Sequence, residues 1–366
     1  MGAPQRFAGD ELRRFCTETL SSLGVPVEAA QITADALIYA DLRGIDSHGI
    51  AHLKRYVNSL RAGAYATERE IVVVHQTPST ALLDGGNGLG YATAVEAIEL
   101  AIEKVGAVGS AYVAARNSHH FGAAGYYAAL ALQHDMIGLC ATNAGPHVVP
   151  TFGIQSQCGT NPIAMAVPAG KEPPFVLDMA TSVKALGKLE ILIREGQEAP
   201  AGWFLQADGS TGGDPQHYLT TLMGTRMGGQ LPLGGDGELQ SGYKGYGLAL
   251  AIELLGPVLA GDTPGPFMPA SAGQPETTKA HLFGAIRIDA FRPAEEFKAE
   301  VDRVLAHIKA SPRAPGHDRI WVAGEKEDDA LQERSAFGIP LHQRVIDDLT
   351  QLAQELHIAP ARAIAV

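Results

Sequence analysis

The sequence predicts a mixed α/β protein with room for two or three domains. Its 366 residues exceed the length of one ordinary domain, and 46% of them are hydrophobic, enough to bury a sizeable core. Short apolar runs typical of strands alternate with longer alanine-rich segments typical of helices. The 42 glycines and 22 prolines indicate many tight connections between these elements.

The chain opens with three predicted helices and continues with strands. The helices span 10–23, 26–40 and 49–60, with Asp10 as an N-cap and breaks at Gly24 and Gly44. Short apolar runs bounded by turn residues predict strands over 71–74, 80–83, 111–115, 137–141, 163–167 and 175–178. Alanine-rich segments predict helices over 92–105 and 123–133, so strands and helices alternate.

The last third of the chain starts with a helix predicted over 246–259, which follows the glycine-rich run 242–247. Residues 262–279 are rich in proline, glycine, serine and threonine, which predicts a surface loop or lid. Strands are predicted over 281–291 and 319–322, and helices over 295–310 and 343–356. No internal repeat is found.

Charge and cysteine usage predict a cytoplasmic protein with a small-molecule partner. The formal net charge of −12 disfavours nucleic acid and anionic membranes as partners. The 3 cysteines are far apart and form no CxxC motif, so disulfides are not expected. We find neither a signal peptide at the start nor an apolar run of about 20 residues that would cross a bilayer.

Two polar clusters are the candidate functional sites. The first lies where one predicted helix ends and the next begins, a junction suited to an anionic ligand or to proton transfer by histidine. It contains Asp41, Arg43, Asp46, Ser47, His48, Gly49 and His52. The second lies between a strand and a helix, where α/β enzymes place reactive groups, and runs from Arg116 to Gly122 through His119 and His120. The alternative for the first cluster alone is an Asp or Ser cap with a surface histidine, and for the second a capped helix with one core histidine.

The residues also bear on two other ligands, a metal ion and a dinucleotide bound by a Rossmann unit. His48 and His52 have the spacing of a metal pair, but Gly49 stands where a zinc-protease helix carries glutamate, so we expect no metal. The glycine runs 85–90 and 242–247 do not match GxGxxG, so a Rossmann unit is not supported. Polar turns at 160–162, 178–182 and 243–247 remain, and Lys244 between glycines suits an anionic group.

At these residues the sequence resembles the type 2 malate and L-lactate dehydrogenase family over nearly the whole chain. The resemblance rests on ordered motifs: ADLRGIDSHGIAHLKRY at 40–56, RNSHHFGAAGYY at 116–127, GTNPIAMAVP at 159–168, LDMATS at 177–182, GYKGYGLAL at 242–250, APG at 314–316 and AGE at 323–325. It implies NAD(P)-dependent hydride transfer between a 2-hydroxy acid and a 2-oxo acid, on a non-Rossmann fold. It also implies a homodimer.

The resemblance assigns roles residue by residue. His120 matches the proton-transferring histidine, and Ser47 and His48 match the active-site SHG motif. Positions that contact the dinucleotide are matched by His120, Phe121, Gly122, Thr142, Asp178, Met179, Ala180, Lys244, Gly245, Ala323, Gly324 and Glu325. Thr160 and Asn161 match a loop beside the substrate.

One position departs from the family pattern. Many relatives carry arginine four residues after the SHG histidine, where this chain has His52. The substrate carboxylate needs a cation, for which arginine is best suited. Arg55, Lys54 or a protonated His52 are the candidates to replace it.

We therefore predict a 2-hydroxy acid dehydrogenase that uses NAD or NADP, with NAD preferred. Residues 1–75 and 310–366 are expected to form a helical substrate-side domain, and residues 76–309 an α/β cofactor domain. The alternatives are a metal-dependent hydrolase that uses the histidines, a non-catalytic dinucleotide-binding protein and, within the family, a cyclic ketimine reductase. Lys188 stands where the ketimine-reducing branch carries aspartate, which favours the 2-oxo acid.

Overall fold

A computed structural model describes residues 5–68, 70–269 and 276–364. Its centre is a seven-stranded mixed sheet with the order β2-β3-β4-β10-β5-β6-β7. The strands are β2 (Val72–Gln76), β3 (Thr80–Asp84), β4 (Ser110–Ser118), β5 (Met136–Thr142), β6 (Ile163–Val167), β7 (Phe175–Met179) and β10 (Lys279–Arg287). Only β3 and β4 pair in parallel, and the other neighbours are antiparallel. The expected mixed-sheet α/β fold class is confirmed.

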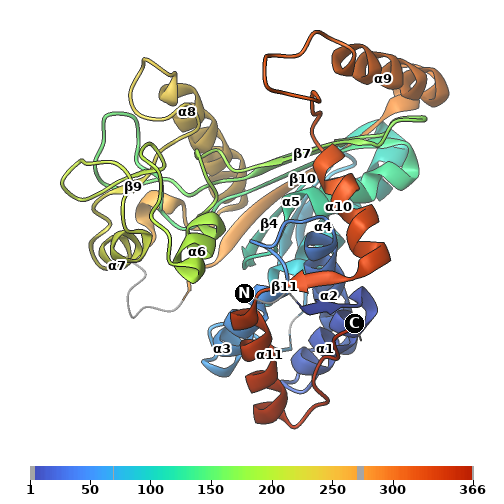
Figure 1. Cartoon of the computed structure of the whole chain (residues 1–366). Coiled ribbons are helices and arrows are strands. Elements are labelled where there is room, and N and C mark those ends of the chain that lie inside the picture. The colour runs from blue at the N-terminus through green and yellow to red at the C-terminus, as the bar shows by residue number, and fades with distance from the viewer. Residues whose placement is uncertain (1–4, 69, 270–275, 365–366) are drawn as a thin grey trace.

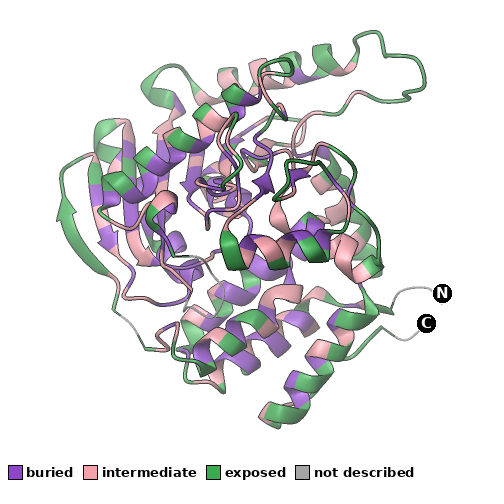
Figure 2. Cartoon of the chain, turned by 90° about the vertical axis from the view of Figure 1, so that its left-hand side faces the viewer, coloured by how far each residue is buried: buried purple, intermediate pink, exposed green. Residues whose placement is uncertain are grey.

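The helices α4 (Gly90–Val108) and α5 (Ala124–Leu130) pack against the sheet. Their buried faces carry small side chains, among them Ala94, Ala97 and Ala128. Because an alanine methyl lets a helix approach closely, the second motif between β4 and α5 is held against the sheet. Figure 2 shows the buried residues gathered between the sheet and its helices.

Helices from both ends of the chain share a second hydrophobic core. It joins α1 (Gly9–Ser21), α2 (Val27–Leu42), α3 (Leu53–Arg61) and α11 (Gln343–Leu356). The end strands β1 (Gln5–Phe7) and β11 (Ile339–Leu341) pair antiparallel, so the two ends of the chain lie together (Figure 1). The domain limits at residues 75 and 310 stay a prediction.

Residues between β7 and β10 form a further helical segment to one side of the sheet (Figure 1). It contains α6 (Leu186–Glu195), α7 (Pro215–Thr225) and the short strands β8 (Phe204–Leu205) and β9 (Gly229–Gln230), followed by α8 (Gly242–Glu253). Neither α6 nor α7 is predicted from the sequence. The capping signal of α7 is present, because Asp214 accepts a hydrogen bond from the Gln216 amide and Pro215 begins the helix.

Several predicted boundaries differ from the structure. The helix predicted over 246–259 begins at Gly242 and changes at Leu254 into a π-helical turn, where Pro257 lacks an amide hydrogen. The strand predicted over 281–291 ends at Arg287, because a 3₁₀ turn begins at Ile288. Of the predicted loop 262–279, residues 270–275 lie outside the described residues, and a 3₁₀ turn occupies Gly265–Phe267.

The strand predicted over 319–322 is wrong. These residues are irregular backbone without a partner strand in the described structure, and they lead into α10 (Glu325–Phe337). The aromatic ring of Trp321 instead packs beneath the guanidinium of Arg319, 3.9 Å away. Helix α9 (Ala294–Lys309) precedes this segment.

Among the described helices, none has the length and apolar character needed to cross a membrane. Cys16, Cys140 and Cys158 are free thiols and are buried.

Candidate active site

Two adjoining cavities lie where the α2–α3 junction meets the start of α5 and the ends of β5 and β7. The larger has a volume of about 390 Å³ and the smaller about 120 Å³. Ser47, His48, Gly122 and Thr160 line both of them. The cavities therefore form one continuous site with a wide part and a narrow part.

Histidines from two distant segments meet in the smaller cavity. His48 and His52 come from the α2–α3 junction, and His120 comes from the β4–α5 connection. The ring centroids of His48 and His120 are 5.7 Å apart, and those of His52 and His120 are 5.3 Å apart. The two clusters of the sequence analysis are thus one cluster in space.

The backbone around Ser47 and His48 is fixed by the buried carboxylate of Asp41. Asp41 accepts a hydrogen bond of 2.7 Å from the Ile50 amide. A Cβ atom at Gly49 would lie 1.7 Å from an oxygen of this carboxylate, so only glycine fits between the two elements. The Ser47 hydroxyl lies 2.9 Å from Nδ1 of His48, and Nε2 of His52 donates to the Ser47 carbonyl over 2.7 Å.

His120 rests on a pair of buried tyrosines. Its Nδ1 lies 2.6 Å from the hydroxyl of Tyr56, which in turn lies 2.8 Å from the hydroxyl of Tyr91. Both tyrosines are fully buried. Because Nδ1 is occupied by this contact, Nε2 is the nitrogen left to act on a ligand in the cavity.

Burial keeps the histidines neutral at pH 7. Removal from water lowers the pKa of His120 well below its ordinary value, and the nearby His52 and Arg55 add to the effect. Burial likewise lowers the pKa of His48 to about 3 and that of His52 to about 4. An uncharged imidazole at His120 is able to accept a proton from a hydroxyl group.

The smaller cavity also holds charged groups. The guanidinium of Arg55 pairs with Glu276 over 2.6 Å, and the hydroxyl of Tyr65 donates to the same carboxylate over 2.6 Å. Burial raises the pKa of Glu276, but Arg55, Tyr65, Lys279 and His119 together outweigh it and the net pKa is lowered. Lys279, at the start of β10, lines the same cavity. His147 lines this cavity as well, and no sequence motif marks Glu276, Lys279 or His147.

Thr142 and Phe121 line the smaller cavity and are backed by a buried histidine. The Thr142 hydroxyl lies 2.6 Å from Nδ1 of His281, whose Nε2 lies 2.9 Å from the hydroxyl of Ser118. The ring of Phe121 stacks on His281 at 4.5 Å. His281 therefore fixes two wall residues without facing the cavity itself.

Half of the predicted dinucleotide positions, six of twelve, line the larger cavity. Asp178, Met179 and Ala180 from the end of β7 face it, together with Ala323 and Gly324 before α10. Asp178 accepts a 2.7 Å hydrogen bond from the Gly125 amide, while burial raises its pKa to about 6. Gly324 has φ +98° and sits against the backbone of Val176 and Pro174, which requires glycine.

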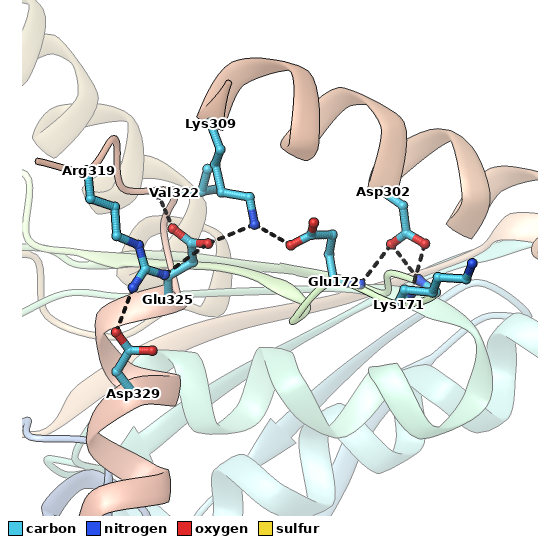
Figure 3. Close-up of polar contacts among 9 residues, drawn as sticks. Lys171, Glu172, Asp302, Lys309, Arg319, Val322, Glu325 and Asp329 are labelled. Atoms are coloured by element: carbon cyan, nitrogen blue, oxygen red, sulfur yellow. Dashed lines mark hydrogen bonds and ion pairs between the residues drawn. The ribbon is translucent and has the colours of Figure 1, made fainter. Parts of the chain in front are cut away.

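The side chain of Glu325 lines neither cavity. It lies in a polar network next to the turn that lines the larger cavity (Figure 3). It accepts from the Val322 amide over 2.9 Å and pairs with Lys309 at 3.0 Å and Arg319 at 3.3 Å. Lys309 also pairs with Glu172. Asp302 on α9 accepts from three successive amides of the β6–β7 connection, at residues 170–172. This network holds the turn with Ala323 and Gly324 against the sheet.

Three other predicted positions lie away from the cavity walls of the single chain. Lys244 and Gly245 lie in the first turn of α8, outside both cavities, and Lys244 is exposed. Asn161 is fully buried behind the wall. Its side chain accepts from the Ala144 amide and donates to Glu253, so it ties the Thr160 loop to neighbouring elements.

Within the described part of the chain, no group of three or more His, Cys, Asp or Glu side chains is placed to hold a metal ion. The histidine cluster instead adjoins a cavity that suits an extended ligand. A wide cavity beside a narrow polar one, on a mixed α/β fold, offers separate places for a cofactor and a small substrate.

This arrangement, together with the comparisons, defines a dehydrogenase of 2-hydroxy acids. The chain belongs to the malate/L-lactate dehydrogenase family, whose model matches residues 7–350. It is 42% identical over 353 residues to a malate dehydrogenase of Pyrococcus abyssi, which covers 96% of this chain and 95% of that protein. It is 39% identical over 345 residues to an L-sulfolactate dehydrogenase of Methanocaldococcus jannaschii, with 94% and 95% covered.

A solved structure agrees with these sequence matches. The malate dehydrogenase of Entamoeba histolytica superposes with a TM-score of 0.94 at 33% identity, over 97% of this chain and 99% of that one. The predicted family, fold class and dehydrogenase activity are confirmed. The hydrolase alternative receives no support from the comparisons.

Proposed function

We propose that this dehydrogenase is a cytoplasmic, NAD-dependent enzyme that interconverts a small 2-hydroxy acid and its 2-oxo acid, with malate and oxaloacetate as the preferred pair. The observation that carries the proposal is the meeting of His48, His52 and His120 at the junction of the two cavities. The malate and L-sulfolactate dehydrogenases at 42% and 39% identity support these substrates. The three free, buried cysteines agree with a reducing compartment.

The residues of the larger cavity suit a nicotinamide dinucleotide. When bound, this cofactor donates or accepts the hydride. Asp178, the 179–180 backbone and the turn at Ala323 and Gly324 would hold it. The charged side chains that line this cavity are Arg43, Lys188, Asp178, Glu327 and Asp328. Because the carboxylates outnumber the cations, a ribose diol is favoured over a 2′-phosphate, which supports NAD over NADP.

His120 moves the proton in this proposal. In oxidation its neutral Nε2 accepts the proton of the substrate hydroxyl, and in reduction it returns a proton to the carbonyl oxygen. Tyr56 holds the ring through Nδ1. A bound carboxylate would add a negative charge near His120 and so favour the protonated form needed for reduction. Ser47 and His48 line both cavities, and the His48 ring stacks on His120 at 5.7 Å.

A cofactor and substrate screen tests the proposal. Purified protein is assayed for NADH and NADPH oxidation with oxaloacetate, pyruvate, 3-sulfopyruvate, 2,3-diketogulonate and a cyclic imine. We expect the highest kcat/KM with NADH and oxaloacetate. Binding of NADH without turnover of any compound would instead identify a non-catalytic dinucleotide-binding protein.

The role of His120 is tested by His120→Ala. We expect kcat to fall by roughly 100- to 10,000-fold, the range that general acid–base catalysis supplies, with NADH affinity nearly unchanged. His75→Ala is the matched control, because His75 is exposed on β2 and lines neither cavity. A His120→Ala enzyme with the activity of the control would remove His120 from this role.

A further inference from the structure

Because His52 stands where many relatives carry arginine, another cation has to anchor the substrate carboxylate, and the structure bears on each of the three candidates named from the sequence. Lys54 points away, since its ammonium pairs with Asp348 at 2.5 Å and hydrogen bonds to Gln351 at 2.9 Å. His52 is neutral at pH 7, because burial and Arg55 lower its pKa to about 4. Neither supplies a positive charge to the cavity.

Arg55 faces the cavity but its charge is already matched. Its guanidinium pairs with Glu276 over 2.6 Å, and Tyr65 holds the same carboxylate from the other oxygen. A substrate carboxylate that bound Arg55 would lie beside Glu276 and meet its negative charge. Arg55 and Glu276 together contribute no net charge to the cavity.

Lys279 is the cation that remains. Its side chain lines the smaller cavity and the residue is only 9% exposed. Its ammonium donates to the carbonyls of Thr277 and Thr278, and among the described residues no carboxylate lies within ion-pair distance of it. A buried ammonium whose partners are neutral carbonyls and not a carboxylate is unfavourable unless an anion binds beside it.

The local backbone explains why this side chain reaches the site. Lys279 is the first residue of β10, opposite Ser118, and the register with β4 shifts between Lys279 and His281. Such a bulge re-aims a side chain relative to regular strand alternation. The histidines of the α2–α3 junction and Lys279 thereby face the same narrow cavity.

We propose that Lys279 is the substrate-binding residue that anchors the carboxylate of the 2-oxo acid, in place of the arginine that His52 replaces. This inference rests on the proposed function, because it assigns one end of the substrate of the same site. It makes Lys279 a determinant of the preference for acids over their neutral analogues. A hydrogen bond between an ammonium and a carboxylate is stronger than one between neutral groups.

The first test compares Lys279→Met with Lys279→Arg. For Lys279→Met we expect the KM of the 2-oxo acid to rise by roughly 10- to 100-fold, the loss of one charge-assisted hydrogen bond, with NADH affinity unchanged. The discrimination between pyruvate and its amide should fall by a similar factor. Lys279→Arg, which keeps the positive charge, should retain most of the wild-type KM and most of the discrimination between pyruvate and its amide. Lys54→Met, which removes a lysine outside the cavities, should leave both parameters as in the wild type.

The pH profile adds a readout that a purely structural lysine would not give. Burial lowers the pKa of Lys279 to about 8, so its charge is lost as pH rises through that value. The charged groups that act on it are Glu276, Asp262, Glu253 and Arg55. We expect 1/KM for the 2-oxo acid to fall above about pH 8 in the wild type and to stay level in Lys279→Arg.

Direct binding separates a failure of this inference from a failure of the proposed function. Oxamate, a carboxylate that is not reduced, is titrated into the protein with NADH and followed by calorimetry. If Lys279→Met binds oxamate more weakly but binds NADH as the wild type does, the result supports Lys279 as the carboxylate anchor, even if no substrate turns over. Equal oxamate affinity in the wild type and Lys279→Met overturns it, as does a parallel loss of NADH affinity, which would mark Lys279 as structural.

Discussion

At the scale of single residues, burial sets the protonation state of His120. Its pKa is lowered first by burial and then by His52, Arg55, His48 and Lys279. The tyrosine hydroxyl at Nδ1 orients the ring without adding charge. An imidazole of this kind is a base throughout the neutral range, whereas a solvent-exposed histidine would be half protonated near pH 6.5.

This pKa predicts the pH dependence of hydroxy acid oxidation. Because the pKa of His120 is lowered, its neutral form persists as pH falls through the ordinary histidine range. We expect kcat/KM for malate oxidation with saturating NAD to stay constant from about pH 7.5 to about pH 5.5. The measurement is an initial-rate profile in a constant-ionic-strength buffer. A decline with an apparent pKa of about 6.5 would show that His120 titrates as an exposed histidine does.

The sequence identifies the residues that sit in short motifs but not those that meet them across the fold. Ser47, His48 and His120 occur in polar runs with glycine, and polar density at the end of an element marks a site. Lys279 and Glu276 follow a long loop without a motif. Only the β4–β10–β5 pairing brings that loop beside the histidines, and a single sequence does not predict this pairing.

At the scale of elements, α9 and α10 position one wall of the larger cavity. Helix α10 has the sequence EKEDDALQERSAF. Its apolar residues are too few to show a helical spacing, so the sequence does not predict this helix. Its first residue, Glu325, matches a family motif, yet its side chain lies in the network of Figure 3 and not in the cavity. Its structural effect is to fix the preceding turn, which faces the cavity.

We therefore expect Glu325→Gln to weaken cofactor binding indirectly. The amide can still accept from Val322 but loses the charge that pairs with Lys309 and Arg319. Since both cations are partly exposed, we expect a stability loss of about 1 to 2 kcal/mol. A looser turn should raise the Kd of NADH by roughly 3- to 10-fold, with kcat at saturating NADH little changed.

The control for this change is Glu300→Gln, which breaks an exposed pair with Arg303 on α9. It should leave both stability and NADH affinity unchanged, because an exposed ion pair contributes little. Fluorescence titration with NADH and thermal unfolding measure the two quantities. Unaltered NADH affinity in Glu325→Gln would show that the network stabilises the fold without shaping the cavity.

At the scale of the whole molecule, distant parts of the chain combine in each functional region. The ends of the chain share one hydrophobic core, and the α2–α3 junction within it supplies His48 to a site whose other walls come from the sheet. The helical character of the ends and the central strands were predictable from periodicity. The segment with α6 and α7 was not, because its apolar residues form a small local core of their own.

The family resemblance of the sequence implies a homodimer, and α8 with the turn after it carries a candidate surface for it. Leu250, Leu254, Leu255, Val258 and Leu259 are between 38% and 61% exposed. Positions 250, 254 and 258 recur every four residues, so they form one apolar stripe. A stripe of this kind is typical of a protein–protein interface. Lys244, which matches a cofactor position but lies outside the cavities, is in the first turn of the same helix.

We expect the wild type to sediment as a dimer and Leu254→Glu to shift it toward the monomer, because a charge would be buried at the centre of the apolar stripe. Analytical ultracentrifugation over a range of concentrations measures the dissociation constant. Val73→Glu is the matched control, since Val73 is 42% exposed on β2, a separate element from α8. A dimer that survives Leu254→Glu but dissociates in Val73→Glu would place the interface at the β2 edge, because that strand has a free side in the sheet order.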